Sequence, residues 1–186
     1  VSDSATGKPV EGVQVLYTLI DESCLIGSTG SDGSLNEKFP VGIGGVLNLM
    51  KENYISKAIE FDADADSEKS ISSGMTPVYK KNIVVRKKSV VKTPAGWQFT
   101  DSPSELNEKE SAIVTLTRIS GPDELDFTSG AAYEGQQKGK SEIDLAPGDY
   151  MADATLLLDD KIVIPEREKC VNVLGPFYEK CYKIPK

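Results

Sequence analysis

The stretch Gly12-Val-Gln-Val-Leu-Tyr-Thr-Leu-Ile20 decides the fold class of this chain. Its odd-numbered residues from Val13 to Leu19 are apolar or aromatic, and alternate side chains of a strand lie on one face. The same alternation recurs over Ile55–Phe61, where Lys57 is the one charged member of the apolar face. Turn sequences such as Gly30-Ser-Asp-Gly33 separate these runs. Short alternating strands bounded by turns predict an antiparallel β-sandwich.

The second half of the chain has the same pattern. Ser111–Ile119 is rich in β-branched residues, which favour strands, and every even-numbered residue of Tyr150–Leu158 is apolar or aromatic. Asp159-Asp160 followed by Lys161–Ile164 predicts a hairpin at the end of this strand. Sustained helical periodicity is missing from the sequence. We therefore predict an all-β protein of two tandem antiparallel β-sandwich domains, immunoglobulin-like or transthyretin-like.

A change in sequence pattern near residue 90 suggests where the two domains meet. We interpret Tyr79–Lys88 as the closing strand of the first domain and residues 89–96 as a linker. The predicted domains are therefore residues 1–90 and 91–186. A domain of this size can bury a core but is only marginally stable alone.

The first half also carries motifs of a known family. Thr6-Gly-Lys-Pro-Val10, Ser28-Thr-Gly-Ser-Asp-Gly-Ser34, Phe39-Pro-Val-Gly42 and Lys51-Glu-Asn-Tyr54 follow one another in an order that resembles carboxypeptidase regulatory-like domains. Asn53 stands where that family usually has glycine, and asparagine also tolerates positive φ. The resemblance implies a transthyretin-like β-sandwich that is non-catalytic and is appended to enzymes or strung along surface proteins. The second half resembles immunoglobulin-like modules only in its general pattern.

Composition excludes several classes of function. The 186 residues include 21 basic and 29 acidic side chains, no histidine, and a formal net charge of -8. Nucleic-acid binding needs a basic face, and Ser-His-Asp or Cys-His catalysis needs a histidine. No apolar run is long enough for a membrane-spanning helix. We therefore expect neither an enzyme nor a nucleic-acid partner.

The three cysteines allow at most one intrachain disulfide. Cys170 and Cys181 flank a short segment with the turn sequence Gly175-Pro176, and we predict a disulfide between them across a hairpin. Two unrelated buried thiols are the alternative. A disulfide would favour an extracellular location. Cys24 is expected to be a small core residue of a strand.

An acidic cluster is the candidate metal site. Asp62, Asp64 and Asp66 alternate with alanine, and a curled backbone would bring their carboxylates together around Ca²⁺. The segment lacks the turn glycine and the bidentate glutamate of an EF-hand. A solvated acidic loop is the alternative, and no other cofactor is expected.

Two further segments suggest binding. Trp97 and Phe99 alternate, so they share one side of a strand and would form a platform for the apolar face of a sugar. The alternative is that Trp97, the only tryptophan, is a core residue. Lys80–Lys92 contains six basic residues, which we interpret as exposed lysines on an edge strand that discourage aggregation.

These patterns favour a structural or adhesive module of a larger cell-surface or secreted protein, such as a filament or surface-layer component. Its partners would be other protein modules, a surface polymer or glycan, or further copies of itself. Strand addition at an unprotected sheet edge is one route to association, and its signature would be a sandwich that lacks one strand. The alternatives are a carbohydrate-binding accessory module of an extracellular enzyme and an intracellular scaffold.

Overall fold

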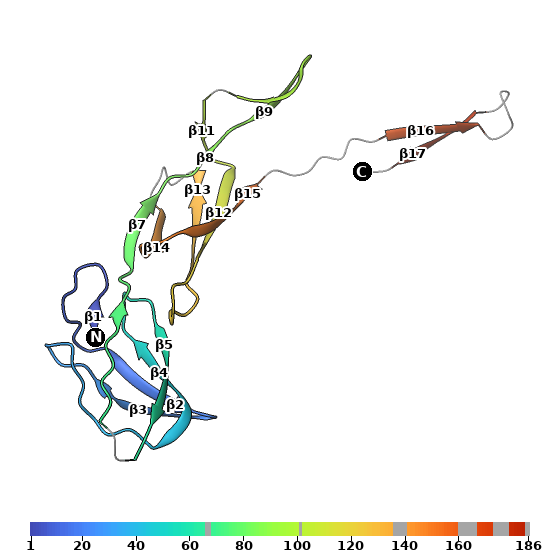
Figure 1. Ribbon diagram of the computed structural model, residues 1–186. Coiled ribbons are helices and arrows are strands. Elements are labelled where there is room, and N and C mark those ends of the chain that lie inside the picture. The colour runs from blue at the N-terminus through green and yellow to red at the C-terminus, as the bar shows by residue number, and fades with distance from the viewer. Residues whose placement is uncertain (66–67, 101, 136–140, 160–166, 173–178, 185–186) are drawn as a thin grey trace.

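The computed structural model describes residues 1–65, 68–100, 102–135 and 141–159 in full, and the backbone of 167–172 and 179–184 (Figure 1). The named secondary-structure elements of these residues are all β-strands. No helix among the described residues is long and apolar enough to cross a membrane. The strands are β1 (Ser2–Asp3), β2 (Gln14–Leu19), β3 (Glu22–Ser28), β4 (Gly42–Met50), β5 (Lys57–Ala63), β6 (Gly74–Met75), β7 (Tyr79–Ile83), β8 (Arg86–Lys87), β9 (Val90–Thr93), β10 (Gly96–Phe99), β11 (Ser104–Glu105), β12 (Glu110–Arg118), β13 (Thr128–Glu134), β14 (Ser141–Leu145), β15 (Tyr150–Leu158), β16 (Arg167–Asn172) and β17 (Glu179–Ile184). The all-β class is confirmed.

The first half is built on an antiparallel sheet in the order β3-β2-β4-β5, beside a short parallel pair of β1 and β6. Val13, Val15 and Tyr17 are buried, as their alternation predicts. They form a core with Leu47 and Leu49 of β4. The apolar face of the sheet thus lies on the side that the sequence indicates.

Aromatic rings complete this core. Tyr17 lies edge-to-face with Phe39 and with Phe61, at 5.9 Å between ring centroids in each case. Phe39 comes from the loop before β4, so the ring contacts fix that loop against the sheet. Asn53 has a φ of 62°, the left-handed conformation expected where asparagine replaces glycine.

The second half contains the antiparallel sheet β13-β12-β15 and the antiparallel pair β7–β14. Ile83, at the end of β7, packs against a small buried cluster that includes Ala112 of β12 and Tyr133 of β13. β7, which is interpreted from the sequence as part of the closing strand of the first domain, pairs with β14. The division at residue 90 stays a prediction.

A turn fixes the entry to β15. The Tyr150 hydroxyl accepts a hydrogen bond from the Ala146 N–H and donates one to the Ala146 carbonyl, both at 2.8 Å. One side chain thus satisfies both backbone groups of a buried residue and sets the direction in which β15 leaves the turn.

Two hairpins project from this arrangement (Figure 1). β9 and β10 pair antiparallel and rise from the short β8–β11 pair. β16 and β17 form the second hairpin, and their register places Cys170 directly opposite Cys181. The predicted strand Lys161–Ile164 lies outside the described residues.

Candidate functional site

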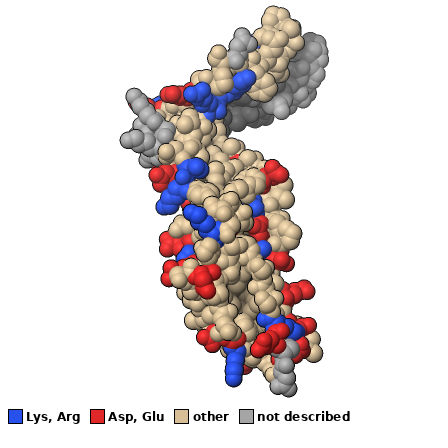
Figure 2. All heavy atoms as spheres, turned by 60° about the vertical axis from the view of Figure 1, so that its left-hand side comes forward, with Lys and Arg blue, Asp and Glu red and all other residues tan. Residues whose placement is uncertain are grey.

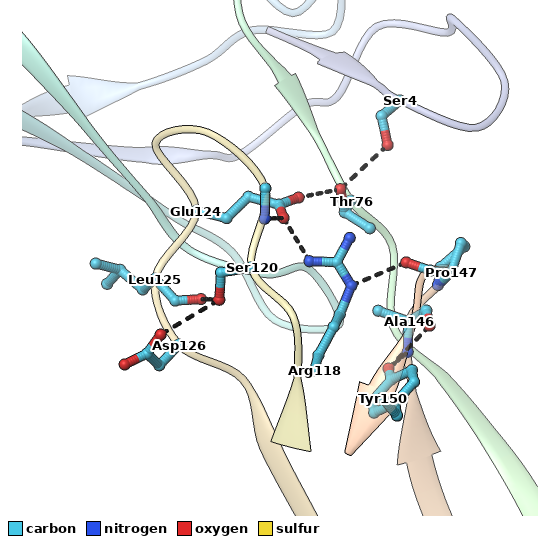
Figure 3. Close-up of polar contacts among 11 residues, drawn as sticks. Ser4, Thr76, Arg118, Ser120, Glu124, Leu125, Asp126, Ala146, Pro147 and Tyr150 are labelled. Atoms are coloured by element: carbon cyan, nitrogen blue, oxygen red, sulfur yellow. Dashed lines mark hydrogen bonds and ion pairs between the residues drawn. The ribbon is translucent and has the colours of Figure 1, made fainter. Parts of the chain in front are cut away.

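The junction between the halves is a buried polar network (Figure 3). Glu124, in the loop between β12 and β13, forms an ion pair with Arg118 at the end of β12. The same carboxylate accepts hydrogen bonds from the Thr76 hydroxyl, between β6 and β7, and from the Gly121 N–H at 2.8 Å. Arg118 also donates from Nε to the Pro147 carbonyl at 2.9 Å. Glu124 therefore ties the second half to the segment that crosses from the first.

Backbone hydrogen bonds reinforce this junction. The Ala58 N–H donates to the Asp123 carbonyl at 2.8 Å, and the Leu125 N–H donates to the Ser56 carbonyl at 2.9 Å. The loop of the second half thus runs beside the start of β5 in strand-like pairing. Backbone and side chains therefore both bridge the halves.

The electrostatics of Glu124 agree with this role. Burial acts to raise the pKa of its carboxyl, but the hydrogen bonds from Thr76, Arg118 and Gly121 outweigh burial, so its pKa lies below the ordinary value. The carboxylate is therefore ionised at neutral pH and compensates the charge of Arg118.

β15 is an edge strand of the second-half sheet in the part of the chain that the structure describes. The Asp159 N–H donates to the Lys109 carbonyl, and the Ile119 N–H donates to the Asp149 carbonyl. Hydrogen-bonded pairs alternate along an antiparallel ladder, so the odd-numbered residues of β15 bond to β12. The N–H and C=O groups of the even-numbered residues therefore point to the open edge.

In the part of the chain that the structure describes, the inward face of β15 is exposed. Its even-numbered residues share a face with Ala112, Val114 and Leu116 of β12, their directly opposite partners. The even-numbered residues of β15 after Tyr150 are all exposed, and Leu158 is 61% exposed. They are Ala152, Ala154, Leu156 and Leu158. An apolar strand face and a row of backbone hydrogen-bonding groups are thus exposed together.

The β9–β10 hairpin carries the predicted aromatic pair. Trp97 and Phe99 are each 70% exposed, so the expectation that Trp97 is a core residue is wrong. The physical reason is that a two-stranded hairpin has no second layer to cover either face. Trp97 lies opposite Lys92 and Phe99 opposite Val90, and all four share one face of the hairpin.

The hairpin is anchored at its base and is basic. Lys87 of β8 forms an ion pair with Glu110 at the start of β12. The hydrogen bond from Lys87, together with one from the Asn107 N–H, holds the pKa of the Glu110 carboxyl below its ordinary value. Residues 86–100 include four basic and no acidic side chains. Figure 2 shows the top of the molecule as a mainly uncharged projection with Lys and Arg side chains at its base.

The acidic cluster is only partly described. Asp62 accepts a hydrogen bond from the Gly44 N–H at 2.6 Å, and Asp64 forms an ion pair with Lys69 at 2.6 Å. Asp66 lies outside the described residues. In the described ranges no three acidic or thiol side chains come together as metal ligands. The calcium site stays a prediction.

The cysteines, too, are only partly described. Cys24 is exposed on β3, so its expected burial is wrong: β3 is an edge strand, and its first four residues, Glu22–Leu25, are all exposed. No disulfide occurs among the described side chains. The side chains of Cys170 and Cys181 lie outside them, although their backbones face each other in register.

The basic segment behaves as expected in its first part. Lys80 and Lys81 are exposed on β7, and Lys80 lies opposite Asp144 of β14. Opposite charges at directly paired positions stabilise a ladder modestly, so these lysines fit the role of solvated edge-strand residues.

A hollow of about 1410 Å³ lies over the inward face of the first-half sheet. Leu47, Leu49 and Phe61 of the sheet and Phe39 and Ile71 of the neighbouring loops contribute to its lining. Most of these side chains also belong to or pack on the first-half core, so the hollow is the incompletely filled space between the sheet and its covering loops.

Comparison with known proteins returned no matching family model, no matching curated protein and no matching solved structure. The site therefore rests on geometry alone. The sequence predicted that Trp97 and Phe99 share one side of a strand, as they do, and their binding role stays a prediction. It did not indicate the Glu124–Arg118 pair or the exposed inward face of β15. The alternation of Tyr150–Leu158 was the available signal for the inward face of β15. Alternation shows that a strand has an apolar face, but it does not show which part of the chain covers that face.

Proposed function

We propose that this chain is a non-catalytic structural or adhesive module of a larger cell-surface or secreted protein, built from two tandem β-sandwich domains. It joins its partner by strand addition at the edge of β15. The observation that carries the proposal is the exposed row of Ala152, Ala154, Leu156 and Leu158, on the residues whose backbone groups point to that edge.

The junction between the halves supports a structural role. A module that transmits force or spaces its neighbours needs domains that keep their relative orientation. The Glu124–Arg118 pair and the backbone bonds of the 120–126 loop provide such a connection. An extracellular location is part of the proposal, since the register of Cys170 and Cys181 is compatible with the predicted disulfide.

Strand addition is tested with a synthetic probe, a peptide of the same length as β15 that alternates valine and threonine between terminal lysines. Binding is measured by calorimetry to the native protein and to Ala154→Lys and Thr155→Lys. Ala154→Lys places a charge on the inward face of the edge, which natural proteins use to block strand pairing. Thr155→Lys makes the same charge change on the outward face. We expect Ala154→Lys to weaken binding about tenfold or more and Thr155→Lys to change it less than threefold. Equal affinity for both variants would refute the proposed site.

A carbohydrate-binding accessory module of an extracellular enzyme is the second candidate, favoured by the exposure of Trp97 and Phe99 on one hairpin face. Flat exposed aromatic rings bind the apolar faces of sugars. Trp97 is the only tryptophan, so intrinsic fluorescence reports this position alone. A spectral shift with one glycan of a panel, together with calorimetric binding of that glycan that is lost in Trp97→Ala, would favour this candidate. An unchanged spectrum across the panel would remove it.

A further inference from the structure

We infer that the partner strand at the β15 edge is β10 of a second copy of this chain, so that copies join head to tail. This inference rests on the proposed strand addition and names its partner. The β9–β10 hairpin stands away from β15 in Figure 1, so the contact is made between two chains.

Backbone parity matches in the two strands. The Thr100 N–H donates to the Ser89 carbonyl, which makes Thr100 and Ser89 a hydrogen-bonded pair. By alternation, Gln98 bonds to β9, while the N–H and C=O groups of Trp97 and Phe99 point to the open edge of β10. In β15 the same is true of the even-numbered residues. In both strands, therefore, residues with outward-pointing backbone groups carry exposed apolar side chains, as do Met151 and Leu157 on the other face of β15.

Side-chain size selects a register. Directly opposite residues of hydrogen-bonded strands share a face, so added Trp97 and Phe99 would turn toward the exposed inward face. The small residues Ala152 and Ala154 leave room there for large rings, whereas Tyr150 does not. The antiparallel register with Trp97 opposite Ala154 and Phe99 opposite Ala152 therefore fills the open face best.

Charge complementarity supports the same pairing. Residues 149–159 contain Asp149, Asp153 and Asp159 and no basic residue. The hairpin residues 86–100 contain Arg86, Lys87, Lys88 and Lys92 and no acidic residue. Two copies with a net charge of -8 repel each other overall, so a local match of this kind determines which surfaces can meet. A heterologous contact of this type joins successive copies into a ring or an open chain.

The first test is a mixing experiment by sedimentation velocity. The double variant Trp97→Ser/Phe99→Ser lacks the aromatic hairpin face but keeps the β15 edge. Ala154→Lys blocks the β15 edge but keeps the hairpin face. We expect the native protein to form concentration-dependent oligomers, each variant alone to be monomeric, and an equimolar mixture to give a capped dimer. The control Val91→Ser/Gln98→Ser changes the opposite hairpin face and should assemble as the native protein does.

A register-specific crosslink keeps the inference testable if the serine variant loses its hairpin. In the proposed register Gln98 lies opposite Asp153, as a close pair that is not hydrogen-bonded. In a Cys24→Ser background, Gln98→Cys and Asp153→Cys proteins are mixed with oxidised glutathione. A covalent dimer from the mixture, at least about tenfold more abundant than from either protein alone, is the expected result. Equal yields would overturn the inference.

The outcomes separate this inference from the proposed function. A native protein that stays monomeric at all concentrations but binds the alternating peptide would overturn the second copy as partner and keep strand addition. A native protein that neither self-associates nor binds the alternating peptide would overturn both the inference and the proposed strand addition. A Trp97 fluorescence shift with a glycan, without self-association, would overturn the inference in favour of sugar binding.

Discussion

Leu156 lies directly opposite Ala112 in the ladder that joins β15 to β12, yet Ala112 is 3% exposed and Leu156 is 46% exposed. Two directly opposite neighbours on one face of a sheet thus differ sharply in exposure. This difference marks where the second half is open, and it leads to the first prediction.

Leu156→Ala should cost little in the isolated chain, and Leu106→Ala should cost much more. Leu106 is buried in the same half, at 6% exposed, so its truncation leaves a cavity and should lower the free energy of unfolding by about 3 kcal/mol. Leu156→Ala should lower it by less than about 1 kcal/mol, because much of its side chain already contacts water. Urea unfolding of the two variants checks this. Similar costs would mean that β15 is covered.

Glu124→Gln should loosen the junction between the halves. The substitution leaves the largely buried Arg118 without its countercharge, and we expect a loss of about 2 kcal/mol in the free energy of unfolding. The matched control is Asp126→Asn, an exposed acid of the same loop, with an expected change within about 0.5 kcal/mol. Urea unfolding measures both, and equal effects would refute the junction's importance.

Acid should destabilise the protein through the same residue. The folded pKa of Glu124 lies below its ordinary value of 4.5, so the stability from its ionised form is complete above that value. This contribution is lost as the pH falls through the lowered folded pKa. The carboxylate of Asp3 contributes to stability in the same way, because its hydrogen bonds outweigh burial and lower its pKa below the ordinary value of 3.8.

The pH experiment compares the native protein with Glu124→Gln. The urea midpoint of the native protein should be nearly constant from about pH 7 to about pH 5 and should fall below about pH 4. The variant should show a smaller fall. A native midpoint that rises on acidification would contradict the assignment.

Tyr150→Phe tests the turn before β15. The variant removes a hydroxyl that serves both the N–H and the carbonyl of buried Ala146, so we expect a loss of about 2 kcal/mol in the free energy of unfolding. Tyr79→Phe, at an exposed tyrosine of β7, is the matched control and should be nearly neutral. Thermal unfolding that ranks the two variants in reverse would count against this account of the turn.

Local pattern predicted the strands well, and the covering of each strand poorly. The alternation of Val13–Leu19 predicted both a strand and its buried face, because the covering loops are present in the same half. The alternation of Tyr150–Leu158 predicted the strand equally well, but its apolar face is exposed. Burial depends on a second layer from elsewhere in the chain, and periodicity carries no information about that layer.

The junction could not be predicted for a related reason. Glu124 is one of several acids in turn-like sequence, and its partner Thr76 is 48 positions away. Only the folded arrangement brings the two together. Trp97 is exposed although tryptophan is usually well buried, because it lies on a two-stranded hairpin.

The central claim is that β15 offers an open edge to another strand, and amide hydrogen exchange of β15 tests it most directly. In dilute monomeric protein, Met151, Asp153 and Thr155 should exchange slowly, and Ala152, Ala154 and Leu156 should exchange fast. Addition of the alternating peptide, or concentration of the protein, should slow the even-numbered amides as well. Even-numbered amides that are already protected in the monomer, or that stay fast with the peptide bound, would contradict the account.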